Sequence, residues 1–426
     1  MSGLTKFFYS TMKGAPVLKQ QWGSLTDLLR GCFVDGFNPQ TAVSVSILDG
    51  LATIVLPESH GFIKHQVVSI SGSDNSDFNM DYRVIDSKGS HIVVKTDLVA
   101  SSVSGVIVVK TAALGWTEKY TGTHKSVYTA KDTVTNPFFL RVDDSMPTGY
   151  NDTWAKFARV TISDGINSID DFSGFKKAPY TTVNPDTNEN GDGVSGTSGI
   201  FGWAKWYHGS YVQSSQSYFY ESQPTSTTVA NKYILNWDIV GDDSTVYLFI
   251  EYRDTSSVNL ETRLIYAFTP IIPFNINDNK TNCLLTAVDT NLSNASNIGG
   301  NASSYIPDFS ANSTRGNFML SDYFDITNKH TKVSFFSMNC SNTSGYTSGI
   351  SFPNPSDNTL IMHEIYVKDG NNMRGKLPII NWLHQRWSGG SKSIIDKDNG
   401  VYLVLGSMYT IGYSQNYVTY HAFKLE

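Results

Sequence analysis

The clearest structural pattern in this chain lies in residues 43–112, VSVSILDGLATIVLPESHGFIKHQVVSISGSDNSDFNMDYRVIDSKGSHIVVKTDLVASSVSGVIVVKTA. Apolar and polar side chains alternate along it, which is the period of a β-strand with two different faces. The dipeptide Asp49-Gly50 separates two such runs and is typical of a two-residue hairpin turn, because both residues tolerate a positive φ angle. A second hairpin is expected from Val84 to Val94, closed by residues 86–90. The stretch therefore predicts a small β module set into a longer chain.

The composition indicates a β-rich protein throughout. Hydrophobic residues make up 40% of the 426 residues and aromatic residues 13%, which is enough for well-packed cores, while charged residues make up only 16%. Much of the polarity comes from Ser, Thr and Asn, whose short side chains suit strands and turns and have poor helix propensity. Helix should therefore be scarce, and a chain of this length is expected to form two or three domains.

Charge, hydropathy and cysteine content argue against several classes of protein. The net charge is −6, from 38 acidic and 32 basic residues with no basic run, so nucleic-acid binding is not expected. No apolar run reaches the roughly 18 residues that a membrane-spanning helix needs, so no membrane insertion is expected. The cysteines, Cys32, Cys283 and Cys340, lack metal-ligand spacing. They are expected to be free buried thiols, unless Cys283 and Cys340 meet in the fold.

Short sequence blocks flank the module on both sides. Before it stand MSGLTKFFYSTMKGAPVL (1–18), GSLTDLL (23–29) and VDGF (34–37), and after it stand LGW (114–116), YTGT (120–123), VY (127–128) and FLRVDD (139–144). Together they resemble a family of tailed-bacteriophage virion structural proteins, over roughly the first third to 40% of the chain. Inside the module, HGF (60–62), VVSISG (67–72) and DYRV (81–84) are similar to small β-barrels that recur in phage tail and fibre proteins.

This resemblance, taken with the composition, implies a mainly β fold with β-sandwich-like domains, a small inserted β-barrel and little helix. It implies a non-enzymatic virion protein that is assembled in the host cytoplasm. Such a chain would be a multi-copy component of the tail or of its attachment, a homo-oligomer in contact with other virion proteins, with no cofactor. Two alternatives stay open: a capsid decoration or head-fibre protein, and a host-glycan-binding adhesin or depolymerase.

The chain is expected to divide into five segments. These are an N-terminal arm with a short helix (1–40), the inserted barrel (41–112), a continuation of the first β domain (113–175), a loop-rich segment (176–231) and a C-terminal β domain (232–426). The helix is expected over residues 24–30, capped by Ser24 and stopped by Gly31. Alternation at Phe138, Leu140 and Val142, with a partner strand at 157–162, predicts half of a β-sandwich.

Two aromatic groups are the candidate interaction sites. The arm carries Phe7, Phe8, Tyr9 and Trp22, which would form a large apolar patch in water. The arm therefore packs either on the domain after the insert or on a neighbouring subunit, and we expect it to be an assembly element. The loop-rich segment carries Trp203, Trp206 and Tyr207, a dense group for a polar stretch. Core packing or a protein interface is favoured for them over stacking on a sugar of a host receptor.

No catalytic residue or metal site is predicted. The pairs Asp143-Asp144, Asp170-Asp171 and Asp242-Asp243 do not form glycosidase dyads by themselves, because adjacent strand residues point to opposite faces. Residues 186–193, DTNENGDG, place oxygen ligands at alternate positions as a Ca²⁺ loop does. The twelfth position is Thr197 rather than Glu, so an Asn/Asp/Gly turn explains the motif equally well.

Overall fold

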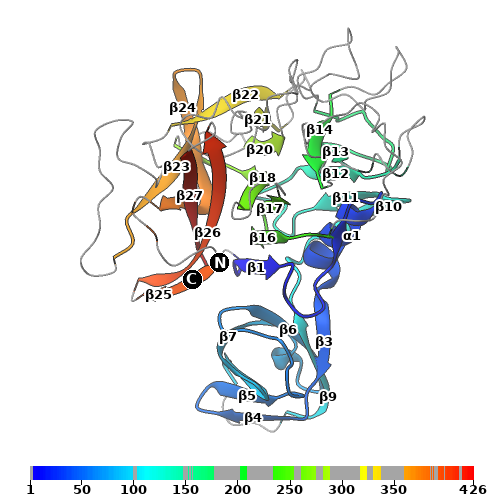
Figure 1. Ribbon diagram of the computed structural model, residues 1–426. Helices are drawn as coiled ribbons and strands as arrows, with labels where there is room; N and C mark the ends of the chain where they lie inside the picture. Colours follow the sequence, from blue (N-terminus) through cyan, green and yellow to red (C-terminus); the bar gives the residue numbers. More distant parts are fainter. Residues whose placement is uncertain are drawn as a thin grey trace.

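The computed structural model shows a mainly β protein with little helix (Figure 1), and this confirms the expected fold class. The structure describes residues 3–98, 103–146, 152, 155, 157–176, 202–208, 234–253, 261–274, 282–287, 317–323, 330–336, 359–383, 385, 387, 392–397, 399–411 and 415–426. Within these ranges the strands form sheets of thirteen, seven, five and two strands, and their pairing is almost entirely antiparallel.

The module of residues 43–112 belongs to the seven-stranded sheet, which projects from the rest of the chain (Figure 1). Its strands are β3 (Phe37–Thr41), β4 (Ser44–Leu48), β5 (Leu51–Val55), β6 (Val67–Ser73), β7 (Asp81–Lys88), β8 (His91–Lys95) and β9 (Gly105–Thr111), with a 3-10 turn η2 (Ser76–Phe78). Alternate strand residues, among them Ile54, Val68 and Val94, form a hydrophobic core of their own.

The sheet of the module is open, which corrects the expectation of a closed barrel. The strand order is β3-β9-β6-β7-β8-β5-β4, and its two end strands do not pair with each other. Strand β3 contains Pro39, which has no backbone N–H to donate, and its register against β9 shifts between Phe37 and Gln40. Such a strand is suited to the edge of a sheet rather than to continuous pairing on both sides.

The first predicted hairpin is confirmed in detail. Leu48 lies opposite Leu51, and the turn residues Asp49 and Gly50 have φ angles of 51° and 75°. The second hairpin has a shorter turn than predicted, because β7 continues to Lys88 and pairs with β8 up to its end. A register shift after Val84 lets residues 86–88 join the ladder.

The N-terminal segment contains β1 (Lys6–Tyr9), β2 (Leu18–Lys19), helix α1 (Ser24–Arg30) and a π-helical turn η1 (Gly31–Asp35). The predicted helix exists and has the predicted bounds, but the predicted capping residues are wrong. Gly23, with φ of 86°, is the N-cap, whereas the Ser24 hydroxyl accepts a hydrogen bond from the Lys19 N–H. Gly31 stays helical, with φ of −59°, because the buried side chains continue through Cys32 and Phe33 into η1.

The five-stranded sheet consists of β10 (Thr117–Gly122), β11 (Lys125–Thr129), β12 (Phe139–Asp143), β13 (Phe157–Ser163) and β14 (Ala204–Tyr207), in that order. The predicted pairing of the strands near residues 140 and 160 is confirmed, since Leu140 lies opposite Ile162 and Val142 opposite Val160.

The thirteen-stranded sheet contains β1 and most of the strands after residue 236. These are β16 (Trp237–Gly241), β17 (Val246–Arg253), β18 (Glu261–Pro270), β19 (Ile272–Pro273), β20 (Asn282–Ala287), β21 (Asn317–Asp322), β22 (Thr331–Phe336), β23 (Met362–Asp369), β24 (Asn372–Leu383), β25 (Ser393–Lys397), β26 (Gly400–Ile411) and β27 (Gln415–Lys424). A short pair joins β15 (Ile234–Leu235) to β2.

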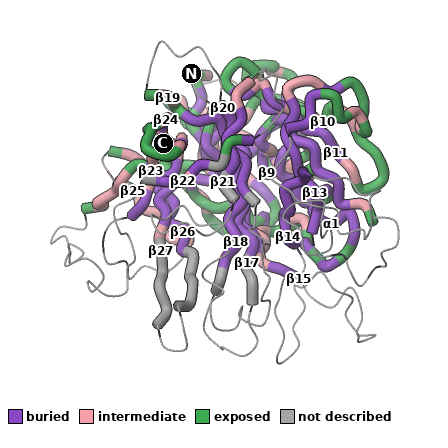
Figure 2. The backbone as a smooth tube through the Cα atoms, turned by 90° about the horizontal axis from the view of Figure 1, so that it is seen from above, coloured by how far each residue is buried: buried purple, intermediate pink, exposed green. Residues whose placement is uncertain are grey.

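The middle strands of this sheet are buried on both faces (Figure 2). On β17, Leu248 packs into a core shared with α1 and the five-stranded sheet, whereas its neighbours Tyr247 and Phe249 pack into a second core with Leu403 and Phe423. Strands from before and after residues 176–231 therefore share one hydrophobic core. Residues 246–250 of β17, VYLFI, are apolar on both faces, as a strand between two layers requires.

Candidate functional site

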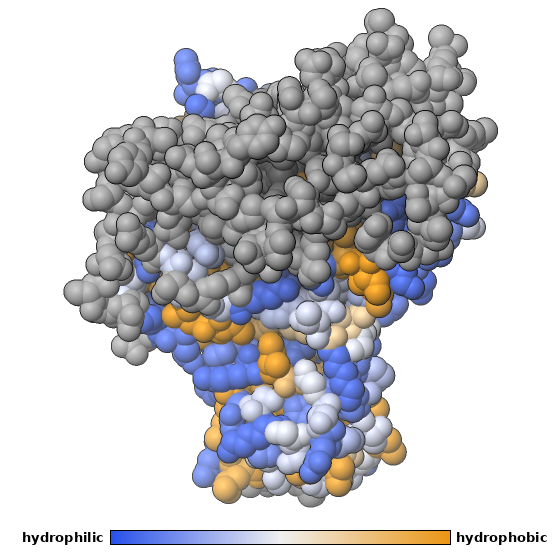
Figure 3. Space-filling model, in the orientation of Figure 1, coloured by the Kyte–Doolittle hydropathy of each residue, from blue (hydrophilic) through white to orange (hydrophobic). Residues whose placement is uncertain are grey.

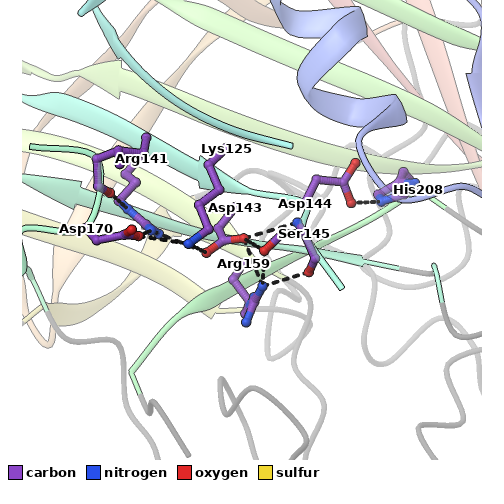
Figure 4. A network of polar contacts seen from close by, with 9 residues as sticks. Lys125, Arg141, Asp143, Asp144, Ser145, Arg159, Asp170 and His208 are labelled. Carbon is purple, nitrogen blue, oxygen red and sulfur yellow. Dashed lines mark hydrogen bonds and ion pairs between the residues drawn. The ribbon is translucent and has the colours of Figure 1, made fainter. Parts of the chain in front are cut away.

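Charged side chains gather on one face of the five-stranded sheet (Figure 4). On β12, Leu140 and Val142 belong to the hydrophobic core, so Arg141 and Asp143 point to the opposite face. Arg159 of β13 lies opposite Asp143 in the register. The FLRVDD block thus supplies both the core side and the charged side of the same strand.

Asp143 is the centre of this charge network. Its Oδ1 accepts hydrogen bonds from Arg159 Nη2 at 2.8 Å and from the Ser145 hydroxyl at 2.5 Å, and its Oδ2 lies 3.3 Å from Arg141 Nη2. Lys125 Nζ lies 3.9 Å from the same carboxylate. Burial alone would raise the pKa of Asp143, but Arg159, the Ser145 hydroxyl and Arg141 outweigh it and hold the pKa below its usual value.

Arg141 is buried and held from several sides. Its Nε donates to the Ile169 carbonyl oxygen at 2.6 Å, and its Nη2 donates to Asp170 Oδ1 at 2.9 Å. The guanidinium carbon lies 5.1 Å from the ring centroid of Phe172 and 4.8 Å from that of Trp203. These contacts join β12 to residues 169–172 and to the segment before β14, with the cation of Arg141 against two aromatic rings that also contact each other.

Asp144 forms a second, fully buried junction. Its Oδ1 lies 2.7 Å from His208 Nε2, and its Oδ2 accepts the Leu25 N–H at 2.9 Å. The Asp144 carbonyl oxygen also accepts the Gly23 N–H at 3.0 Å. Burial would lower the pKa of His208, but the charge and hydrogen bond of Asp144 raise it above its ordinary value. The pair ties the start of α1 to the end of β12 and to the residue after β14.

The aromatic side chains of the arm lie in the core of the chain itself. Strand β1 pairs with β16, and Phe7, Phe8, Tyr9 and Trp22 are all buried. Phe7 and Phe8 point to opposite faces, so each belongs to a different core. Of the two destinations left open by the sequence, the structure shows packing on the same chain, and these rings do not form an assembly surface.

The aromatic group of the loop-rich segment is also buried. Trp203, Trp206 and Tyr207 are each at most 1% exposed. Trp206 donates its ring N–H to the Thr286 carbonyl oxygen at 2.7 Å and stacks on Tyr266. They are core residues, so the sugar-stacking and interface alternatives for them are corrected. They are buried because β14 lies beside β13 and packs against β20.

Asp170, Asp171 and Asp242, from the acidic pairs of the sequence, make contacts within the fold. Asp170 binds Lys125 and Arg141, Asp171 caps the backbone at Asn167 and Ser173, and Asp242 caps the turn to β17. The described residues do not bring three or more His, Cys, Asp or Glu side chains into a group that could hold a metal ion. Cys32 and Cys283 are free and buried, as predicted. The calcium-loop motif at 186–193 and Cys340 lie outside the described residues.

Arg83 forms a junction that was not singled out from the sequence. Its side chain donates to the carbonyl oxygens of His65, Thr5 and Leu425 at 2.8, 3.0 and 2.6 Å, and its Nε lies 2.7 Å from Glu426 Oε1. The module is thereby fastened to both ends of the chain, which lie side by side in Figure 1. Carbonyl acceptors carry no side-chain signature, so this role had no sequence signal.

His208 and Asp144 were likewise not recognised as a pair, because 64 positions separate them. The adjacent acids at 143 and 144 were predicted not to act together, and the structure agrees: each has different partners on different sides of the strand. None of the helical segments in the described ranges has the length and apolar character that crossing a membrane requires.

No protein-family model matches the chain, and no curated protein matches it. Among solved structures, the chain is similar at 11% identity to one named phage phi92 endosialidase, with a TM-score of 0.16. The match covers 92% of this chain and 53% of the other, so this chain spans about half the length of that protein. A likeness at this TM-score supports no conclusion about fold or function.

Proposed function

We propose that this chain is a structural protein of a tailed-bacteriophage virion, a multi-copy component of the tail or of its attachment to the particle. It works by assembly with copies of itself and with other virion proteins, and it carries out no catalysis. It is built in the host cytoplasm and resides in the particle.

One observation supports this proposal above the others: the sequence blocks that resemble the virion family fold into a single unit although the module separates them. Leu114 N–H donates to the Cys32 carbonyl oxygen at 2.9 Å, and the rings of Phe33 and Trp116 lie 4.9 Å apart. Asp144 of the later block binds the backbone N–H of Leu25 in the earlier block. Leu25, Leu114, Trp116 and Asp144 of the resembling blocks thus build the junction around α1, together with Cys32 and Phe33, which lie between two of these blocks.

The contacts of Asp143, Asp144 and Asp242 favour a structural role over a glycosidase. A glycosidase needs one carboxyl group that can give a proton and a second that can attack or activate water across a sugar. Asp143 and Asp144 are instead buried in ion pairs with cationic or histidine partners, and Asp242 accepts three hydrogen bonds in a turn. These groups stabilise the fold and are not presented to a substrate.

The test has two readouts on one set of particles. Purified virions should contain the chain in many copies, as measured by quantitative mass spectrometry and by labelling in electron micrographs. Virions and purified protein incubated with host capsule or lipopolysaccharide should release no reducing ends. Absence of the chain from washed particles would refute the structural role. Release of reducing ends, abolished by one Asp→Asn change in otherwise intact particles, would show a depolymerase instead.

A further inference from the structure

The described sheet edges differ in how well they are protected against pairing with another chain. Most edges carry a blocking device: β3 contains Pro39 and a register shift, and β10 contains Glu118, Lys119 and a register shift. Strand β25 ends in Asp396 and Lys397. Charges, proline and irregular register are the usual means by which a sheet edge avoids pairing with another strand.

Strand β4 has none of these devices. Its sequence, SVSIL, contains no charged residue and no proline, and its register against β5 is regular from Ser44 to Leu48. It is the last strand in the order of its sheet, and Figure 1 places it at the end of the module away from the larger sheets. A regular, uncharged and exposed edge strand is a ready template for another β-strand.

The hairpin geometry identifies the backbone groups that β4 presents. In a hairpin with a two-residue turn, the residues flanking the turn exchange both hydrogen bonds, and such pairs then alternate along the ladder. Ser44, Ser46 and Leu48 are therefore bonded to β5. The backbone N–H and C=O groups of Val45 and Ile47 point outward, away from β5.

The side chains near this edge are more apolar than a solvated edge requires. Val45 and Ile47 are only half-buried at the margin of the module core, and Val43 and Leu48 are 70% and 69% exposed. Apolar atoms reach the surface at this lower end of the module in Figure 3. A strand added beside β4 would cover Val45 and Ile47 and extend the core.

We propose that the β4 edge binds the β4 strand of a second copy of this chain, antiparallel and about a two-fold axis. The strand is complementary to itself: an axis at Ser46 places Val45 opposite Ile47 of the second copy, so their outward backbone groups exchange hydrogen bonds. The same register keeps core-side residues opposite core-side residues, because the two positions differ by an even number. The larger sheets extend away from β4, so the remaining parts of the two copies would lie on opposite sides of the strand pair and would not collide.

This interface is small, since one strand pair buries less surface than the about 1,200 Å² of a stable complex. It suits a contact that is weak between two isolated copies and strong when many copies are held together. The pairing deepens the proposed function by naming the surface for self-assembly. It rests on that proposal only for the presence of many copies.

The test uses the purified full chain and two matched pairs of variants. Sedimentation measured over a concentration series up to about 100 μM should show self-association of the wild type. Ser46→Lys places two like charges at the axis and should weaken association at least about tenfold. Ser71→Lys, the same change at an exposed position of the interior strand β6, should leave association unchanged.

The second pair tests the register. Facing residues in a pair without mutual hydrogen bonds have Cα atoms about 4.5 Å apart, which a disulfide can span. Ser46→Cys should form a cross-linked dimer on oxidation with copper phenanthroline, whereas Ser71→Cys and the wild type should not. The free energy of unfolding of every variant should lie within about 1 kcal/mol of the wild-type value, because both positions are exposed.

A monomeric wild type that also gives no Ser46→Cys cross-link would overturn the interface. Self-association that Ser46→Lys leaves intact would overturn it too, because another surface would then hold the copies together. Either result leaves the proposed function standing if the chain is still found in many copies in virions. Absence of the chain from virions would refute the proposed function, but the self-association measured in solution would be unaffected.

Discussion

The buried pair of Asp144 and His208 offers the sharpest test of how this fold is held together. The change Asp144→Asn keeps the size of the side chain but removes its charge. Both partners are completely buried, and Asp144 accepts hydrogen bonds from two sides, at 2.7 Å from His208 and 2.9 Å from Leu25. An amide can accept only on its oxygen, so its NH₂ group would face one of the two donors.

The expected magnitude follows from these contacts. Removing one partner of a buried ion pair costs about 3–5 kcal/mol, part of which is the penalty for a buried donor left without an acceptor. For a chain of this size, such a loss corresponds to a decrease in Tm of about 3–6 °C. Asp170→Asn is the matched control, because Asp170 also has two donor partners, Lys125 and Arg141, but is 55% exposed. Its loss should cost less than about 1 kcal/mol.

The penalty should depend on pH. The pKa of His208 is raised in the folded protein, so the stabilisation from its protonated form is fully present below the unfolded pKa of 6.5. It is lost as pH rises through the raised folded value. Urea unfolding of wild type and Asp144→Asn should therefore show the largest difference near pH 6 and a smaller one near pH 9. A cost below about 1 kcal/mol near pH 6, or one that grows with pH, would refute this account.

Three further outcomes are expected. Phe8→Ala should destabilise the isolated chain by about 3–5 kcal/mol, measured by urea unfolding, because the ring is in the chain's own core; a loss of particle incorporation with unchanged stability would contradict this. Arg83→Met should loosen the module and increase hydrogen exchange at its junction, whereas Arg30→Met, at an exposed position, should not. The fragment 37–112 should fold alone and give a dispersed amide NMR spectrum, since it carries its own core. A spectrum with little amide dispersion would show that the module needs the rest of the chain to fold.

Local pattern was enough to predict much of the secondary structure. The turn at Asp49-Gly50 and the alternation through residues 44–55 depend only on backbone preference and side-chain period, so the hairpin could be read from the sequence. The same holds for the pairing of β12 with β13, whose apolar residues alternate. Helix α1 was also found, but the buried side chains of Cys32 and Phe33 continue the helical backbone through Gly31 into η1, against the local stop signal.

The role of each candidate site residue depended on contacts with residues that are far away in the sequence. The sequence shows that Phe8 and Trp206 are apolar and must be covered, but not what covers them; strands β16 and β20, far along the chain, do so. Asp144 meets His208 and Arg83 meets Leu425 only because sheets bring distant residues together. Alternation and turn chemistry are local and act between near neighbours. Burial, ion pairing and the exposure of an edge strand are properties of the assembled sheets, and only the tertiary structure decides them.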